Sequence, residues 1–348
     1  MMTDFVRQLP GSLPSDVQTL RGLRIAVVYG AVSEEDAVYI HSAPRAEWSL
    51  TAIMRVLQDH GLDAEHLDPT APDFAERVRG FDAAFVNVHG PYGEDGRLQG
   101  LLEYLNVPYT GSGVLAGSVG MDKLVCKAIF RHLGLATPRD SGLLAGQIPA
   151  GFPLPGMLKA VDGGSSVGTR LVDNSAQIAE AIREFTGRGF RRYFLEEFIA
   201  GRALTVAVIG GPAGSVALAP LEFVTEAAFY DEASKLGGAS APSVQYQFPE
   251  DLPPSVVKAM SVGAEAAYDF LDCRGAIRVD YIVDDAETVY ALEINTIPGL
   301  QPHSNLPAAC ARAGIPYDAL VLRLLAQAVR AHRPVPWAAP GRPRPESA

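Results

Sequence analysis

The sequence predicts an α/β protein large enough to form two or three compact units. Residues 23–30 form a continuous apolar run that ends in glycine, as a buried parallel strand does. Residues 43–60 follow with apolar side chains near helical spacing, and residues 81–88 form a second apolar run. A β-α-β start of this kind places ligands at the carboxyl ends of its strands, where Glu35 and His89 fall.

The predicted elements continue in order through the middle of the chain. Residues 113–133 read as one long helix, and short apolar runs predict strands at 157–160 and 170–172. Between these strands, residues 162–168 form a glycine-serine hairpin whose backbone N–H groups could cover the phosphates of ATP. Taken alone, such a stretch is more often a plain turn.

The second half of the chain alternates strands and helices around one long irregular segment. Strands are predicted at 193–198 and 204–209, and helices at 256–270 and 317–331. Residues 212–252 are rich in Gly, Ala, Ser and Pro and show few regular patterns. A loop of that length in a compact domain is usually a lid or a binding loop.

The composition is that of an ordinary globular protein with an acidic charge balance. Of 348 residues, 48% are hydrophobic and 20% are charged, and the formal net charge is −11. This charge argues against nucleic acid or an anionic membrane as the main partner, but not against ATP, which needs only a local basic pocket. No run approaches the roughly 18 apolar residues that span a bilayer.

The two terminal segments predict disorder, and the few cysteines indicate a reducing compartment. The N-terminal residues show no apolar core of signal-peptide length. We expect residues 1–22 and the proline-rich residues 334–348 to be disordered. Three scattered cysteines, Cys126, Cys273 and Cys310, are too few for a disulfide framework or a zinc site. A cytoplasmic location is the expectation that follows.

Two apolar, strand-like runs near the C-terminus, RVDYIV and YALEINTIPG, carry the most informative polar residues. Asp280 lies on the first run, and Glu293 and Asn295 lie on the second. Acidic residues inside apolar strands are costly unless they are paired or bound to metal, and these oxygen donors suit Mg²⁺ held against phosphates. Arg278 shares a strand face with Asp280, because side chains alternate with period two. The pattern indicates nucleotide-driven phosphoryl transfer.

Other charged residues could serve a nucleotide site, although each has an ordinary explanation. The candidates for phosphate contact are Lys123, Lys159 and Lys235, and a lone lysine of this kind is usually solvated. The end of the strand at Glu196 and Glu197 could read adenine, or it could be an ordinary amphipathic strand. Glu35 could hold a substrate ammonium, whereas the position of His89 alone favours a structural histidine.

Taken in order, six segments resemble the D-alanine–D-alanine ligase family of ATP-grasp enzymes. They are residues 89–113, 121–123, 158–168, 229–235, 278–280 and 293–307. The resemblance covers roughly residues 23–330 and implies a three-part ATP-grasp fold, with ATP between the last two parts. It implies an N-terminal α/β substrate domain at 23–115, a small central domain at 116–200, and a C-terminal domain at 201–333 that carries the lid loop 212–252.

The resemblance also implies a role for each candidate residue. Substrate binding falls to Glu35 and His89 for the first D-amino acid, to Ser304 and Asn305 for the second, and to Val38 as a further substrate contact. ATP binding falls to Lys123, Lys159, Lys235, Gly164, Ser166, Phe229, and the adenine-contact segment Glu196, Glu197 and Ile199. Ser165 links the glycine-rich loop to the substrate network, and Arg278 with the Gly299 backbone forms the oxyanion site. Two Mg²⁺ ions, with Mn²⁺ as an alternative, fall to Asp280, Glu293 and Asn295.

The resemblance implies ATP-dependent ligation of amino acids, which are small-molecule substrates. It also implies a homodimer. A carboxylate attacks the γ-phosphate of ATP and forms an acyl phosphate. The amine of a second substrate then attacks the acyl carbon, and phosphate leaves. A closing lid would exclude the water that hydrolyses the intermediate.

Four positions depart from the family pattern. Leu236 replaces a tyrosine, Asn305 replaces a leucine at the second-substrate wall, Ala203 replaces a ribose-binding glutamate, and Ala160 replaces a proline. Two of these changes lie on the second-substrate side, so an altered acceptor is one hypothesis. Lactate is not favoured, because residues 212–252 contain no histidine. A natural-product ligase of the same fold and a non-catalytic nucleotide-binding paralogue are the alternatives.

Overall fold

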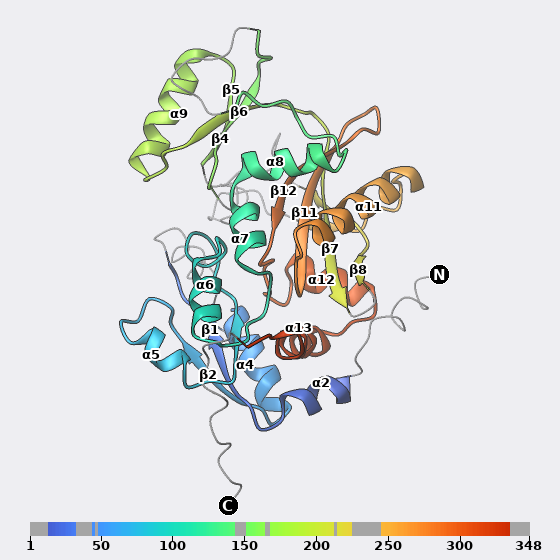
Figure 1. Cartoon of the computed structure of the whole chain (residues 1–348). Helices are drawn as coiled ribbons and strands as arrows, with labels where there is room; N and C mark the ends of the chain where they lie inside the picture. The colour runs from blue at the N-terminus through green and yellow to red at the C-terminus, as the bar shows by residue number, and fades with distance from the viewer. Residues whose placement is uncertain are drawn as a thin grey trace, which may run out of the picture.

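The described residues form three sheets, and helices pack against each of them (Figure 1). This is a computed structural model, and it describes residues 13–32, 44–45, 48–142, 151–163, 168–211, 214–224 and 245–334. The N-terminal sheet lies at one end, the largest sheet lies in the middle, and a small sheet lies at the other end (Figure 1). The mixed α/β class that the sequence predicts is confirmed.

The N-terminal sheet is parallel, with strand order β2-β1-β3. Its strands are β1 (Arg24–Val28), β2 (Asp63–Leu67) and β3 (Ala83–Val86), and its helices are α4 (Ser49–Asp59), α5 (Phe74–Val78) and α6 (Arg97–Tyr104). Strands β1 and β3 agree with the apolar runs of the sequence. Strand β2 was not predicted, because its DAEHL segment is mostly exposed and lacks an apolar run. The helix that we expected from residue 43 begins only at Ser49.

The expectation of disorder through residue 22 is wrong for residues 13–20, which form helix α2 (Leu13–Leu20). Leu20 is fully buried in a core that contains residues of helix α13 (Tyr317–Ala331). Asp16 on α2 is 1% exposed and accepts a hydrogen bond from Arg330 at 2.8 Å. The partners that order this segment lie about three hundred residues away, so local composition could not reveal them.

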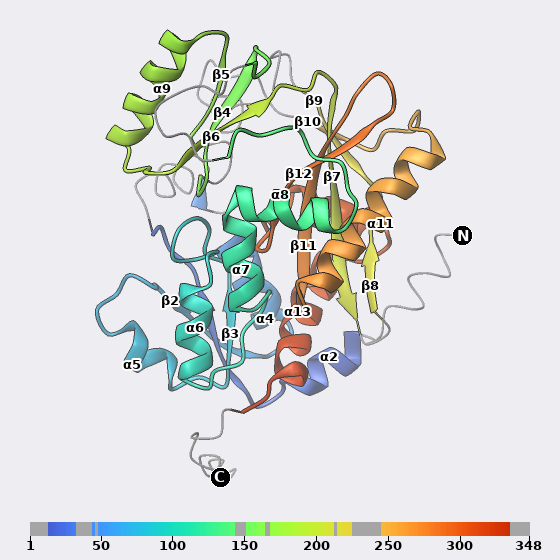
Figure 2. The same ribbon diagram turned by 45° about the horizontal axis from the view of Figure 1, so that its top comes forward.

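The single helix expected at 113–133 is also wrong, because Asp122 divides it in two. Helix α7 (Val114–Met121) ends at Asp122, whose backbone is extended, and α8 (Lys123–His132) begins directly after it. The Asp122 carboxylate caps α8 by accepting from the Val125 N–H at 3.0 Å. The break lets the two helices run in different directions (Figure 2).

The small central sheet is antiparallel, with strand order β5-β4-β6. It consists of β4 (Gly156–Ala160), β5 (Thr169–Val172) and β6 (Tyr193–Glu197), and helix α9 (Ser175–Gly187) covers one face. Leu158 and Leu195 point into the apolar cluster with α9. Lys159 and Glu196 alternate with them and lie on the opposite face. That face looks toward α8 (Figure 2).

The largest sheet has six strands in antiparallel pairs, ordered β10-β9-β7-β11-β12 with β8 beside β7. Its strands are β7 (Arg202–Gly211), β8 (Gly214–Ala217), β9 (Leu221–Val224), β10 (Gln245–Gln247), β11 (Ala276–Val283) and β12 (Val289–Asn295). Helix α11 (Pro254–Phe270) buries one face. The expected loop 212–252 therefore needs correction, because its described residues include three short strands. Strands this short show little periodicity.

The last two helices join the C-terminal half of the chain to the N-terminal sheet. Helix α12 (Asn305–Arg312) and helix α13 contribute to the same core as Ile25 and Val27 of β1. Helix α13 packs on α2, α4 and β3. Within the described ranges, no helix has both the length and the apolar character needed to cross a membrane.

Candidate active site

The register of β11 and β12 brings together the oxygen donors that the sequence singled out. Asp280 pairs with Glu293, and Arg278 pairs with Asn295. Residues directly opposite in an antiparallel pair share a sheet face, with Cβ atoms about 5 Å apart. Because Arg278 and Asp280 are two residues apart, all four side chains belong to one face.

Arg278 and Thr205 hold the Asp280 carboxylate in place. The Arg278 guanidinium donates to both Asp280 oxygens, at 2.8 and 2.9 Å. The Thr205 hydroxyl, on the neighbouring strand β7, donates to Asp280 Oδ1 at 2.7 Å. Arg278 is only 8% exposed, so this two-point contact is shielded from bulk water. The sequence did not predict a role for Thr205, because only the register of β7 and β11 shows that it lies opposite Asp280.

Glu293 and Asn295 complete a donor set that fits Mg²⁺. The Glu293 carboxylate lies 3.1 Å from Lys123 Nζ, and Asn295 Oδ1 accepts from the Ile297 N–H at 3.0 Å. No cluster of three or more His, Cys, Asp or Glu side chains suited to a metal occurs in the described part of the chain. The set is therefore two carboxylates and one amide oxygen. Such a hard, incomplete set suits Mg²⁺, which keeps waters and phosphate oxygens among its ligands.

Helix α8 supplies two lysines to the site from one face, since Lys123 and Lys127 are four residues apart. Lys123 contacts the Glu293 carboxylate and donates to the Gly163 carbonyl at the start of the predicted glycine-serine hairpin. Burial by itself would lower the pKa of Lys123, but the Glu293 carboxylate raises that pKa above its ordinary value. Lys123 therefore stays protonated.

A second carboxylate, Glu196, lies between two lysines. Its Oε1 atom contacts Lys159 Nζ, and its Oε2 atom lies 2.7 Å from Lys127 Nζ. Lys127 also donates to the Thr137 hydroxyl at 2.9 Å. Burial would raise the pKa of Glu196, but Lys159 and Lys127 together hold that pKa below its usual value. Burial lowers the pKa of Lys127 to about 8.

Lys127 was missed by the sequence analysis, although one signal pointed to it. It follows Lys123 by one helical turn within a predicted helix, so both side chains had to share a face. The carboxylate of Glu196 is occupied by two lysines, so any contact of this residue with a base falls to its backbone. Next to it, Glu197 is half-buried and lies 3.2 Å from Arg139 Nε. Ile199 is half-buried just beyond β6.

The candidates for the substrate side lie where the chain leaves β12 for the N-terminal unit. Ser304 occupies the position just before α12, and its hydroxyl donates to the Gly299 carbonyl oxygen at 2.7 Å. Asn305 is the first residue of α12 and is 5% exposed. Ile297 belongs to the apolar cluster of β1 and β3, so this loop lies against the N-terminal sheet. His89, just beyond β3, contacts Glu94 Oε1 at 3.1 Å.

Several predicted site residues lie outside the described ranges, and their placement stays a prediction. They are Glu35, Val38, Gly164, Ser165, Ser166, Phe229 and Lys235, and Leu236, which departs from the family pattern, also lies outside these ranges. The described residues therefore bring together the three oxygen donors, Arg278, Lys123, Lys159 and Glu196. The positions of the glycine-rich loop and of the Glu35 carboxylate are predicted from the sequence alone.

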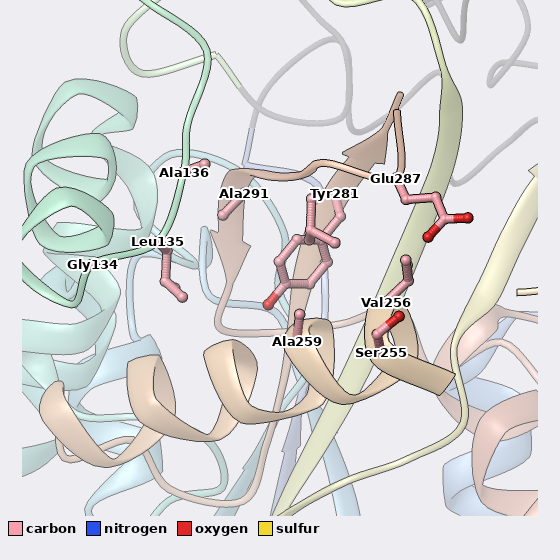
Figure 3. Close-up of a pocket in the computed structure, with 10 residues that line it drawn as sticks. Gly134, Leu135, Ala136, Ser255, Val256, Ala259, Tyr281, Glu287 and Ala291 are labelled. Carbon is pink, nitrogen blue, oxygen red and sulfur yellow. The ribbon is translucent and has the colours of Figure 1, made fainter. Parts of the chain in front are cut away.

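One cavity, of about 370 Å³, lies apart from this constellation. It lies between α11, residues 134–136 and the β11–β12 hairpin, with the Tyr281 ring against α11 (Figure 3). Tyr281 and Asp280 are neighbours on β11 and point to opposite faces of the sheet. The cavity is therefore behind the donors and is not the site where they act.

Comparison with known families gives two matches along this chain. The family model described as D-ala D-ala ligase C-terminus matches residues 137–326, and the model described as D-ala D-ala ligase N-terminus matches residues 49–112. The first match alone covers more than half of the chain. It includes Arg278, Asp280, Glu293 and Asn295.

Similar proteins carry the same family name in sequence and in structure. A D-alanine–D-alanine ligase of Anaeromyxobacter sp. (strain K) is 39% identical over 320 residues, covering 89% of this chain and 98% of that protein. The enzyme of that name from Bordetella pertussis is 37% identical, covering 88% and 95%. The solved structure of D-alanine–D-alanine ligase from Bacillus anthracis complexed with ATP has a TM-score of 0.72 at 27% identity and covers 89% and 98%. The ligase structure from Coxiella burnetii has a TM-score of 0.70 at 27% identity.

Proposed function

This chain belongs to the D-alanine–D-alanine ligase family of ATP-grasp ligases, and we propose that it joins two D-amino acids through an acyl phosphate. The observation that carries the proposal is the face shared by Arg278, Asp280, Glu293 and Asn295, with Lys123 reaching Glu293 from α8. Such a face offers a cation for an oxyanion and hard oxygens for a phosphate-bound metal, side by side.

ATP is the energy source of this reaction, and its phosphates need cations on the protein side. We assign Lys123 and Lys159 to the phosphates, together with Lys235 and the backbone of the glycine-rich loop at Gly164 and Ser166. Both described lysines are largely buried and lie beside carboxylates, which keeps their positions defined. A buried, prepositioned cation stabilises phosphoryl transfer more than a solvated one does.

Asp280, Glu293 and the amide oxygen of Asn295 would hold Mg²⁺, and we propose two ions there with Mn²⁺ as an alternative. Bound metal would neutralise charge on the phosphates during transfer. Arg278 positions Asp280 through two hydrogen bonds, so the same residue orders one metal ligand and presents a guanidinium to the reacting carbonyl. The Gly299 backbone is the second donor that we propose for the oxyanion.

The carboxylate of the first D-amino acid attacks the γ-phosphate, and ADP leaves. Glu35 and His89 are the residues that we assign to its ammonium group, and Val38 is a further residue that we assign to substrate binding. The amine of the second amino acid then attacks the acyl carbon, and phosphate leaves with the carboxylate oxygen that formed the acyl phosphate. Ser304 and Asn305 start α12 beside this region and are our assignment for the second substrate.

We propose D-alanine as the first acceptor to test, although Asn305 and Leu236 depart from the family pattern. The relatives described above are named for D-alanine ligation on both sides. The dipeptide would then enter peptidoglycan, which is the role of this family. No comparison favours a natural-product ligase or a non-catalytic paralogue.

The assembly and setting of the enzyme are also part of the proposal. We propose a homodimer in the cytoplasm, where three buried free cysteines would stay reduced. We place the domains at 23–115, 116–200 and 201–333. The change of sheet between β6 and β7 supports the boundary near residue 200.

Phosphate release from Mg-ATP tests this function, first with D-alanine alone and then with a panel of second amino acids and D-lactate. We expect release with D-alanine and a product whose mass is that of D-alanyl-D-alanine. Release that requires a different acceptor would move the second substrate to that compound. An enzyme that binds Mg-ATP but releases no phosphate with any acceptor would overturn the proposal.

A further inference from the structure

Glu196 and its two lysines form an ion cluster with unequal members. Glu196 is 3% exposed and the Lys127 side chain is fully buried, whereas the Lys159 side chain is 13% exposed. Each lysine contacts a different oxygen of the one carboxylate. The cluster therefore carries two positive charges against one negative charge, in a place almost free of water.

Lys127 is fixed where it is by its surroundings. It rises from helix α8, and its ammonium group donates both to Glu196 Oε2 and to the Thr137 hydroxyl. Lys123, one turn earlier on the same helix face, is committed to Glu293 on the largest sheet. Helix α8 thus contacts one carboxylate on each of two sheets. The Lys127 side chain is fully buried, so it is not accessible to a ligand.

Lys159 differs because it can leave the cluster without leaving a bare buried carboxylate. It lies next to the end of β4, directly before the glycine-serine hairpin, and retains some exposure. If it moved to an anion, Glu196 would keep Lys127 as its counter-ion. A buried charge that loses its last partner is strongly destabilised, whereas one that keeps a hydrogen-bonded partner is not.

We propose that Lys127 is a positioning residue for ATP binding, which acts as the permanent counter-ion of Glu196 and so frees Lys159 to bind a nucleotide phosphate. The inference rests on the proposed function in taking ATP as the ligand of Lys159. It adds a residue that touches neither ATP nor metal. Without Lys127, Glu196 would retain Lys159, and ATP would have to compete with a buried carboxylate.

Charge removal at Lys127 separates this role from a purely structural one. In Lys127→Met, the dissociation constant of Mg-ATP, measured by calorimetry without amino acids, should rise by about tenfold or more. The KM for ATP should rise in parallel, with a smaller change in kcat. In the double variant Lys127→Met with Glu196→Gln, no carboxylate remains to retain Lys159. Most of the lost affinity should then return.

The matched control is Lys258→Met, which removes an exposed lysine from helix α11 and should leave the dissociation constant unchanged. Thermal melting confirms folding of each variant. If Lys127→Met does not fold, Lys127→Gln keeps a donor to Glu196 while removing the charge, and the same weakening is expected. Unchanged ATP affinity in the folded single variant would overturn the proposal. A loss that Glu196→Gln fails to reverse would also overturn it, since a packing role predicts no recovery.

The failure of the proposed function gives a different result. A wild-type protein that binds Mg-ATP but forms no dipeptide would contradict the ligase assignment, while the binding constants would still decide the role of Lys127. A wild-type protein that binds no Mg-ATP would overturn both.

Discussion

Arg278 lies at the centre of the candidate site and is bound to Asp280 by two hydrogen bonds. Its two donors fix the Asp280 carboxylate, and its largely buried guanidinium places a positive charge beside the oxygen donors of the candidate site. The sequence predicted this pairing, because alternation on a strand puts residues two apart on one face. It could not predict Thr205 or the Lys127–Glu196 contact, since those depend on which strands and helices become neighbours.

Arg278→Lys keeps the charge at this position but loses the planar two-point contact, and Arg278→Ala removes both. We expect kcat to fall by about 10²-fold or more in the alanine variant, because the donor that we propose for the oxyanion is lost. The lysine variant should lie between it and the wild type. Phosphate release at saturating ATP measures the effect. Arg183→Ala, at an exposed position on α9, is the matched control, and near-normal turnover in Arg278→Ala would contradict the assignment.

The turn and the register of the β11–β12 hairpin decide which side chains come together at the candidate site. The Asp284 carboxylate accepts from the backbone N–H groups of Ala286 and Thr288, at 3.0 and 2.7 Å, and so fixes the turn. The turn sets the register that pairs Tyr281 with Ala291, and a one-residue register shift just beyond that pair places Asp280 opposite Glu293. The sequence predicted both strands because they are apolar and β-rich. It missed the short strands β8, β9 and β10, whose partners decide their structure more than their composition does.

Arg202 connects β7 to β9 and to the segment before α11. Its guanidinium donates to both oxygens of Glu222 at 2.7 Å and also contacts Asp251. The hydrogen bonds from Arg202 hold the pKa of Glu222 below its usual value. A depressed carboxylate pKa stabilises the fold above the unfolded pKa of about 4.3, and that contribution is lost as the pH falls through the folded pKa.

Glu222→Gln should therefore lower the free energy of unfolding at neutral pH by about 1–3 kcal/mol. The difference between wild type and variant should shrink as the pH falls below about 4. Urea melts over a range of pH values measure it, and Glu250→Gln, at an exposed position nearby, is the control. A difference that is constant from neutral to acid pH would show that the charge of Glu222 is not the cause.

Elements that are far apart in the sequence pack together across the molecule. Helices α2 and α13 pack together, and residues of α12 and α13 share a core with the N-terminal sheet. The loop from β12 to α12 therefore lies between the oxygen donors of β11 and β12 and the N-terminal sheet. The order of motifs predicted three parts and their order along the chain. The role of residues 13–20 could not be predicted, because their partners are distant in sequence.

Leu20→Ala tests whether the packing of α2 on α13 stabilises the fold. Leu20 is fully buried against the shared core, and its truncation should destabilise the protein by about 2–5 kcal/mol. Thermal melting measures the effect, and Gln18→Ala, at an exposed position on the same helix, should change little. An unchanged melting temperature in Leu20→Ala would mean that α2 does not contribute to the folded state in solution.

The transfer of a labelled oxygen tests the central claim most directly. D-alanine with heavy oxygen in its carboxylate is incubated with the enzyme and Mg-ATP, and the released phosphate is analysed by mass. If the carboxylate attacks the γ-phosphate, one labelled oxygen per turnover appears in phosphate, together with D-alanyl-D-alanine. Release of unlabelled phosphate would mean that water attacks ATP, and it would contradict an acyl phosphate at this site.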